Sequence, residues 1–261
     1  MSDNSIYLQA VTEVARVAGD VAGQHYRRRV SVETKLDGTP VTIADRSAEE
    51  AARQWIERRF PDDGILGEEF PTVREGARRT WVIDPIDGTK TFIRDVPLWG
   101  SLVAVIEDKT VIAGAAFFPA VSEIIGAGVG CGCWWNDSRA QVSSIDDLAS
   151  ATILTSASPF SSKESLNARW ANLEASTLAS RTWGDCFGYL MVATGRAEVM
   201  ADPVLSLWDI AAFLPIISEA GGVLTDFSGK ETPFGGSAIA TNSALDKSVR
   251  EILIPAQLTT N

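Results

Sequence analysis

The feature that most constrains this chain is an acidic turn that directly follows a short apolar run in residues 81–89. The run reads Trp-Val-Ile, which is typical of a buried strand, and Asp-Pro-Ile-Asp-Gly-Thr follows it. Pro85 fixes its own φ angle, and Gly88 permits backbone conformations that other residues avoid. Asp84 and Asp87 can therefore face one point where the chain leaves the strand. Paired carboxylates in such a turn predict a site for a hard cation such as Mg²⁺.

The residues around the two acids extend this prediction to an anion. The carbonyl of Ile86 lies between the acids and is a candidate third ligand of the cation. Residues 88–92 resemble a helix start, where free N–H groups and the positive end of the helix dipole hold an anion. A phosphate group and a metal ion would then be neighbours. An ordinary acidic turn is the alternative, and the added Pro, Gly and Thr make it less favoured.

Length and charge exclude several kinds of partner. The chain has 261 residues, 45% of them hydrophobic, which is enough for one large core or two closely packed subdomains. Its apolar stretches are interrupted well before the roughly 18 residues that a membrane span needs, and residues 1–4 lack the basic start of a signal peptide. A net charge of -11 removes the usual driving force for nucleic-acid binding. We therefore expect a cytoplasmic protein without a membrane or nucleic-acid partner.

Cysteine and histidine usage narrows the possible chemistry. Cys131, Cys133 and Cys186 match neither a disulfide framework nor a zinc site, so three reduced and mostly buried thiols are expected. His25 is the single histidine and lies in a segment with helical spacing of apolar residues. A histidine-ligated metal cluster is therefore excluded, and a phosphohistidine mechanism is disfavoured. General-base work falls to carboxylates, hydroxyls or metal-activated water.

Apolar periodicity predicts a first half of mixed helices and strands. Asp45 is expected to be the N-cap of a helix that Pro61 stops, and a turn is expected at residues 35–40. Glycine at every second residue of 126–132 predicts a twisted hairpin rather than a nucleotide loop. The other elements expected in this half are a helix over 11–26 and strands at 65–66, 81–83, 102–106 and 111–118.

Strands and helices alternate after residue 138, which is typical of an α/β arrangement. We therefore predict an N-terminal α+β subdomain at 1–140 with the metal motif and a C-terminal α/β subdomain at 141–261. They should form one structural unit with the active site in a cleft between them. A frayed tail is expected at 256–261. The elements expected in the second half are strands at 152–156, 199–201 and 223–226 and helices at 164–174, 185–194 and 209–220.

One competing motif is the Asp-x-Asp-Gly-Thr of haloacid-dehalogenase-type phosphatases. This chain has two residues between the acids rather than one, and its motif lies a third of the way along. Residues 84–89, with Gly-Glu-Glu at 67–69 and Trp-Asp-Ile-Ala-Ala at 208–212, instead resemble the three-part signature of the inositol monophosphatase family. The resemblance extends roughly over residues 35–236. It implies a mixed α+β and α/β fold, the layered αβαβα sandwich of the inositol monophosphatase/fructose-1,6-bisphosphatase type.

The resemblance also implies a metal-dependent phosphomonoesterase with a definite set of site residues. Four carboxylates in one cleft would repel strongly without cations, and two or three Mg²⁺ ions are expected. Glu68 and Thr89 would orient the attacking water, with no covalent enzyme intermediate. The phosphate would bind at Asp87, Gly88 and Thr89. The implied metal ligands are Glu68, Asp84, Asp87, Asp209 and the Ile86 carbonyl.

Several of these residues have ordinary alternatives. Glu68 taken alone could be a solvated loop acid, and Asp209 could simply be the N-cap of its helix. Asp45 matches an acid that lies behind the metal ligands in the family, yet capping explains it equally well. Lys35 is either a cation near the phosphate or an exposed lysine.

Finer similarity favours a cationic phosphorylated metabolite as the substrate. Lys90, the run at 97–102 and the segment 184–189 resemble the bacterial histidinol-phosphate phosphatases of the family. Histidinol phosphate carries an amine and an imidazole that need carboxylate partners in the pocket. Asp185 and Asp202 are the candidates, with an ordinary cap or surface acid as the alternative for each.

Other readings stay open. Leu207 stands where these phosphatases frequently have proline, which weakens the substrate assignment slightly. Inositol 1-phosphate or another sugar or polyol phosphate is the alternative substrate, followed by a 3'(2'),5'-bisphosphate nucleotide. A non-catalytic dimeric binding protein is the alternative from a different class. The family resemblance also suggests a homodimer.

Overall fold

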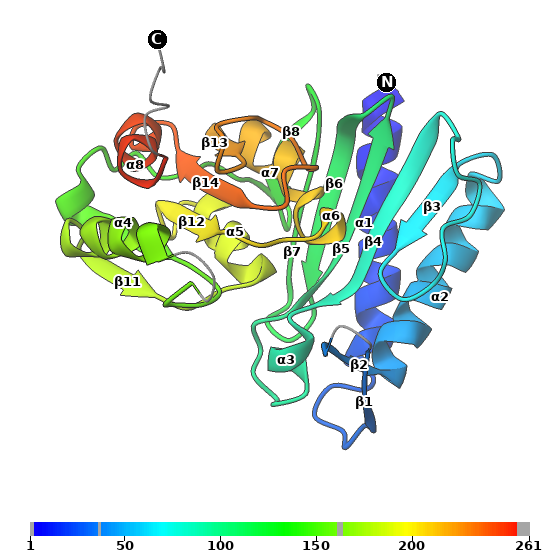
Figure 1. Ribbon diagram of the computed structural model, residues 1–261. Helices are drawn as coiled ribbons and strands as arrows, with labels where there is room; N and C mark the ends of the chain where they lie inside the picture. Colours follow the sequence, from blue (N-terminus) through cyan, green and yellow to red (C-terminus); the bar gives the residue numbers. More distant parts are fainter. Residues whose placement is uncertain (1–2, 36–37, 161–163, 255–261) are drawn as a thin grey trace, which may run out of the picture.

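Five alternating layers of helices and sheets build this protein (Figure 1). The structure is a computed structural model that describes residues 3–35, 38–160 and 164–254. Three separate groups of buried apolar side chains lie between the layers. The predicted layered sandwich is therefore confirmed, because each of the two large sheets buries both of its faces against helices.

The first sheet has seven strands in sequence order. Only β3 and β4 run parallel, and every later pair is antiparallel. The strands are β3 (Gly64–Gly67), β4 (Arg79–Asp87), β5 (Gly100–Glu107), β6 (Thr110–Phe118), β7 (Glu123–Gly128), β8 (Gly132–Trp135) and β9 (Ser138–Arg139). The hairpin predicted from the alternating glycines is confirmed as β7 and β8.

Helices α1 (Asp3–Gly23) and α2 (Ile43–Arg59) cover one face of this sheet. Successive side chains of a strand point to opposite faces, so Trp81 and Ile83 of β4 pack under these helices. Val82 packs on the other side, in the group that contains the central helices. A continuous apolar run at residues 81–83 is therefore what a strand buried on both faces requires.

The second sheet has five strands in the order β11-β10-β12-β14-β13. Its strands are β10 (Thr152–Leu154), β11 (Ala179–Arg181), β12 (Val199–Asp202), β13 (Gly222–Thr225) and β14 (Ala238–Asn242). Leu154 and Met200 face the central layer, whereas Ile153 and Val199 face the outer helices. The central layer holds α5 (Cys186–Ala193) and α7 (Phe213–Glu219), and the outer one holds α4 (Glu164–Ala175) and α8 (Asp246–Leu253).

Small elements connect these layers near the acidic motif. A two-stranded hairpin, β1 (Val32–Thr34) with β2 (Pro40–Thr42), precedes α2. Gly38 in its turn has a φ of 86°, which suits the predicted turn signal, although Leu36 and Asp37 lie outside the described residues. Three short helical turns also occur. The turn α3 (Thr89–Phe92) begins at the last residue of the acidic motif, α6 (Leu207–Ile210) precedes α7, and η1 (Leu148–Ser150) precedes β10.

Two predicted helix starts are wrong for the same reason. Helix α2 begins at Ile43 with Thr42 as its N-cap, and Asp45 is the third helical residue, whose carboxylate accepts the Thr42 N–H at 2.7 Å. The helix expected at 209–220 is two helices, and the first is capped by Ser206 with Asp209 again at the third position. Each acid belongs to a capping box, in which the cap residue and the third residue bond each other's backbone N–H.

Other boundaries differ more modestly. Helix α1 ends at Gly23, so His25 lies in the turn that follows rather than in the helix. Strand β14 and helix α8 are absent from the predicted elements, because they are only five and eight residues long and so give few repeats of an apolar pattern. The expected tail at 256–261 lies outside the described residues, and the domain division near residue 140 stays a prediction. Among the described helices, none is both long and apolar enough to cross a bilayer.

The contact between Gly114 of β6 and the start of α7 gives a stability prediction. A methyl group on Gly114 would lie 2.7 Å from the Ala212 Cα and closer still to its carbonyl oxygen. Gly114→Ala should therefore lower the free energy of unfolding by about 1–3 kcal/mol, since sheet and helix must separate. Urea denaturation measures the change. Gly23→Ala is the control, because its methyl group would meet only Pro119 at 3.6 Å. Equal effects would contradict the prediction.

Candidate active site

A cavity of about 390 Å³ brings the predicted acids together. It is formed by both halves of the chain, from the ends of β3 and β4, the start of α3, and the segment around α6. Asp185, at the start of α5, lies at the same cavity. The residues lining it are Thr39, Pro40, Glu68, Asp84, Ile86, Asp87, Gly88, Thr89, Lys90, Asp185, Val204, Ser206, Trp208 and Asp209.

A bulge in β4 turns Asp84 and Asp87 toward the same cavity. In a regular strand, residues three apart point to opposite faces. Here Asp84 pairs with Leu102 and Asp87 with Gly100, so β4 uses one residue more than β5 between these pairs. The Ser101 hydroxyl donates to the Pro85 carbonyl at 2.6 Å and fixes the bulge. The extra residue is what lets both acids line one site.

The start of α3 adds a hydroxyl group whose proton is already used. Gly88 adopts the left-handed conformation, with a φ of 87°, and the chain turns there into α3. Thr89 Oγ1 lies 3.0 Å from the Ile86 carbonyl oxygen and 3.3 Å from Asp45 Oδ1, and both can only accept. With its single proton directed there, the hydroxyl faces the cavity as an acceptor.

Lys35 bridges the two glutamates that follow β3. Its Nζ lies 2.6 Å from Glu68 Oε1 and 2.6 Å from Glu69 Oε1. Burial raises the pKa of Glu69 to about 7, although the lysine opposes this shift. Lys35 is therefore placed by two carboxylates at the edge of the acidic cavity and is not a free surface lysine.

The acids of the cavity destabilise one another as anions. Burial raises the pKa of Asp84 well above its usual value, and the charge of Glu68 raises it further. Burial and the charge of Asp185 do the same to Asp87. The pKa of Asp209 rises to about 6, mainly through burial. A cation bound among these oxygens would remove this cost.

The donor set fits a hard divalent cation, with four carboxylates and one backbone carbonyl at a single cavity. In the described part of the chain, no three acidic, histidine or cysteine side chains lie close enough together to coordinate one metal ion as they stand. Glu68 is drawn toward Lys35, and Asp209 Oδ2 accepts the Ser206 N–H at 2.7 Å. The candidate ligands therefore share one cavity without forming a closed set around a single point.

Asp185 lies between this cavity and a second one of about 410 Å³. Lys90 lines both, and the second is otherwise formed by residues around Arg94, Ser156 and Gly184. Asp185 has a φ of 52° and is held by its N–H, which donates to Ser156 Oγ at 2.8 Å. Burial raises the pKa of its carboxyl group. The second cavity thus extends the acidic one beyond the position expected for a phosphate.

Asp202 does not line either cavity, contrary to its expected contact with the substrate. It is 3% exposed, and its oxygens accept the Ser156 N–H at 2.9 Å, the Ser156 hydroxyl at 3.0 Å and the Tyr189 hydroxyl at 3.2 Å. Asp202 therefore holds Ser156, which in turn holds Asp185. The sequence motif at 184–189 includes Tyr189 but does not indicate its bond to Asp202, and no sequence signal identified Ser156, because the partners lie in other strands and helices.

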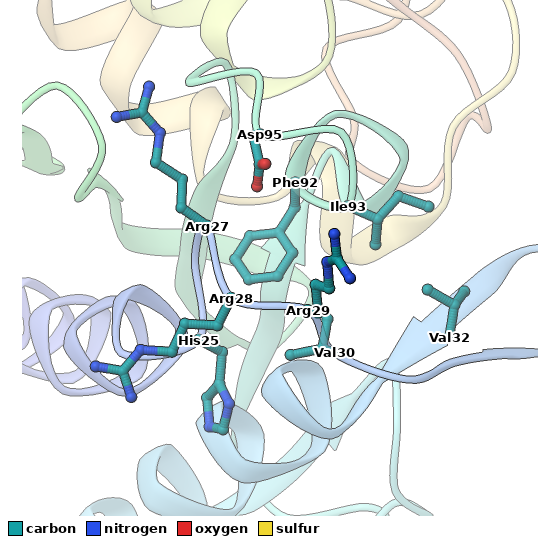
Figure 2. Close-up of a pocket in the computed structure, with 9 residues that line it drawn as sticks. All are labelled: His25, Arg27, Arg28, Arg29, Val30, Val32, Phe92, Ile93 and Asp95. Carbon is teal, nitrogen blue, oxygen red and sulfur yellow. The ribbon is translucent and has the colours of Figure 1, made fainter.

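His25 lies in a different pocket of about 220 Å³, behind α3. Arg27, Arg28 and Arg29 line this pocket with it, together with Phe92 and other residues. Figure 2 shows the three guanidinium groups pointing in different directions, so they do not converge on one ligand. The histidine does not line the acidic cavity.

The chain thus combines a five-layer fold with an acid-lined cavity at the ends of β3 and β4. A model of the inositol monophosphatase family matches residues 3–258, and the chain belongs to that family. The family predicted from the three motifs is therefore confirmed.

Individual relatives agree with this assignment. The chain is 40% identical over 244 residues to the histidinol-phosphatase of Chlorobaculum parvum, covering 93% of this chain and 94% of that one. It is also 40% identical over 223 residues to the histidinol-phosphatase of Mycobacterium tuberculosis, with coverage of 84% and 86%. The crystal structure of extragenic suppressor protein SuhB from Bartonella henselae superposes with a TM-score of 0.89, at 26% identity and 95% and 98% coverage.

The buried Asp202 predicts a pH-dependent difference in stability. Burial raises its pKa to about 6, compared with about 3.9 for an unfolded aspartate. Its stabilising contribution is present below pH 4 and is lost as the pH rises through 6, by about 3 kcal/mol in total. Asp202→Asn cannot titrate, so its stability relative to the wild type should increase from pH 4 to pH 7. Urea denaturation of both proteins across this range measures it, and parallel curves would contradict it.

Proposed function

We propose that this chain is a magnesium-dependent phosphomonoesterase that converts L-histidinol phosphate to L-histidinol and phosphate. The observation that carries the proposal is the single cavity where five carboxylates, four of them proposed ligands, and Ile86 meet the start of α3. Such crowded anions suit a cation, and the adjoining backbone turn suits a phosphate. Within the same proposal, the enzyme is a cytoplasmic homodimer without a nucleic-acid or membrane partner.

The residues that would hold Mg²⁺ are those whose oxygen atoms line the cavity. When bound, Mg²⁺ supplies positive charge that stabilises the phosphoryl oxygens and makes a nearby water more acidic. The number of ions, two or three, stays a prediction from the family resemblance. The proposed ligands are Glu68, Asp84, Asp87, Asp209 and the Ile86 carbonyl.

Thr89 and Glu68 are proposed to orient the attacking water from the protein side. The Thr89 hydroxyl donates toward Ile86 and Asp45, so it accepts a hydrogen bond from water in the cavity. Glu68 has only one oxygen in its short contact with Lys35, and the other can accept as well. Two acceptors hold the two protons of one water and direct its lone pair toward the phosphorus. The backbone of Gly88 and Thr89 and the Asp87 carboxylate border the phosphate position.

Asp185 is proposed to select a cationic substrate. It lies where the two cavities join, beyond the phosphate position, and its burial makes an unpaired carboxylate costly there. A substrate ammonium or imidazolium group would offset this cost with a charge-assisted hydrogen bond. The names of the two 40% identical relatives support histidinol phosphate as that substrate. Asp202 contributes indirectly, because it fixes Ser156 against the Asp185 backbone.

Replacing one proposed ligand tests the metal site. Asp84→Asn removes a charge at the centre of the acid cluster while keeping its shape. Mg²⁺-dependent phosphate release should fall by more than about 100-fold, because changes even to groups that support metal ligands cost 10–100-fold. Phosphate release at a range of Mg²⁺ concentrations, with folding checked by circular dichroism, measures this. Unchanged activity would refute the site assignment.

A substrate panel combined with Asp185→Asn tests the choice of substrate. Histidinol phosphate should give the highest kcat/KM in a panel with inositol 1-phosphate, a sugar phosphate and a phosphoadenosine. Asp185→Asn should raise the KM for histidinol phosphate by about 10- to 100-fold, because a charge-assisted hydrogen bond contributes about 1.5–3 kcal/mol. Asp95→Asn is the matched control, since Asp95 also has a positive φ but lies in the pocket behind α3. A far higher kcat/KM for inositol phosphate or phosphoadenosine would overturn the proposal.

A further inference from the structure

Glu49 is a fully buried carboxylate that the proposed chemistry does not use. It lies on α2, one helical turn after Asp45, with no exposed surface. Its Oε2 accepts the Glu69 N–H at 2.7 Å, and its Oε1 accepts the Phe70 N–H at 3.2 Å and Arg53 Nε at 2.7 Å. The carboxylate therefore has a charged partner and two backbone partners from a segment about 20 residues away.

The same carboxylate is packed tightly against Gly67. A methyl group added to Gly67 would lie 2.7 Å from Glu49 Oε2 and closer still to the other atoms of the carboxylate. Gly67 has no positive φ in the structure, so the reason for glycine is the close approach of Glu49 and not a special backbone angle. The carboxylate cannot turn aside without breaking its hydrogen bonds to Glu69 and Phe70.

Arg53 completes the attachment from the other end. Its guanidinium group bonds Glu49 through Nε and donates to the Phe70 carbonyl at 3.0 Å through the opposite nitrogen. The Glu49–Arg53 ion pair thus bonds both the N–H and the carbonyl of Phe70, and it also accepts the Glu69 N–H. An apolar side chain at position 49 would leave two part-buried backbone donors without this acceptor.

These contacts hold Gly67, Glu69 and Phe70, and the residue between them is Glu68. Its side chain lines the acidic cavity and contacts Lys35. We propose that Glu49, together with Arg53, is a positioning residue that fixes the backbone of Glu68 so that its carboxylate reaches the cavity. The inference rests on the proposed function for the role of Glu68, whereas the attachment itself is a property of the fold.

Glu49→Gln is the sharpest test, because it keeps the shape and replaces one acceptor oxygen with an amide that donates. Only one of the two oxygens then remains to serve the Glu69 N–H, the Phe70 N–H and Arg53. Mg²⁺ affinity, measured by titration calorimetry without substrate, should weaken by about 10- to 100-fold, as for other groups that support a metal ligand. At saturating Mg²⁺, kcat for histidinol phosphate should fall while its KM stays within about 3-fold.

Glu219→Gln is the matched control. Glu219 also accepts two backbone N–H groups, those of Gly130 and Gly132, each at 2.7 Å, but it anchors the β7–β8 turn far from the cavity. It should lower the melting temperature without changing Mg²⁺ affinity or kcat. Equal losses of Mg²⁺ affinity in the two variants would show a general stability effect and overturn the positioning role.

Arg53→Lys keeps the test decisive if Glu49→Gln does not fold. Lysine retains the charge but cannot bond Glu49 and the Phe70 carbonyl together with one planar group, so about 3- to 10-fold weaker Mg²⁺ binding is expected. Unchanged Mg²⁺ affinity and kcat in Arg53→Lys, or in folded Glu49→Gln, would overturn the proposal. If the wild-type chain hydrolyses no phosphomonoester, the proposed function fails, and the Mg²⁺ titrations still decide the role of Glu49.

Discussion

Mutual repulsion among buried carboxylates is the constraint on which the rest of this structure depends. Asp84, Asp87, Asp185 and Asp209 come from three distant parts of the chain and line one cavity. Burial raises the pKa of each, and neighbouring carboxylates raise the pKa of Asp84, Asp87 and Asp209 further. Holding like charges together requires a rigid frame, since a flexible one would let them separate. Two sheets with both faces buried supply that frame, and the cavity opens where their edges and the central helices meet.

Local devices then set the direction of each acid. The β4 bulge turns two aspartates of one strand to the same side. Capping boxes orient two further aspartates. Asp45 accepts the Thr42 N–H with Oδ2 and the Thr89 hydroxyl with Oδ1, and Asp209 accepts the Ser206 N–H with Oδ2. A carboxylate has two oxygens, so one can cap a helix while the other serves the site. Capping and function are therefore compatible roles for these residues.

Two buried acids that do not line the cavity hold the residues that do. Asp202 holds Ser156 and through it the Asp185 backbone, and Glu49 holds the segment on either side of Glu68. Both supporting acids are almost completely buried, and each accepts several hydrogen bonds that keep its charge in place. The precision of the cavity thus depends on groups that do not line it.

The sequence by itself determined the family, the acidic motif and most of the helices and strands, because these depend on local spacing. Asp84 and Asp87 follow an apolar run at a fixed distance, and the apolar run at residues 102–106 and the alternating glycines at 126–132 reflect strand geometry directly. Only the tertiary structure decided that Asp202 lies behind the site and that Glu49 supports Glu68, whereas the capping boxes of Asp45 and Asp209 depend on local spacing. The partners of Asp202 lie 13 to 47 residues away along the chain, and the backbone partners of Glu49 lie 20 and 21 residues away. Hydrogen bonds over such separations leave no periodic pattern in a single sequence.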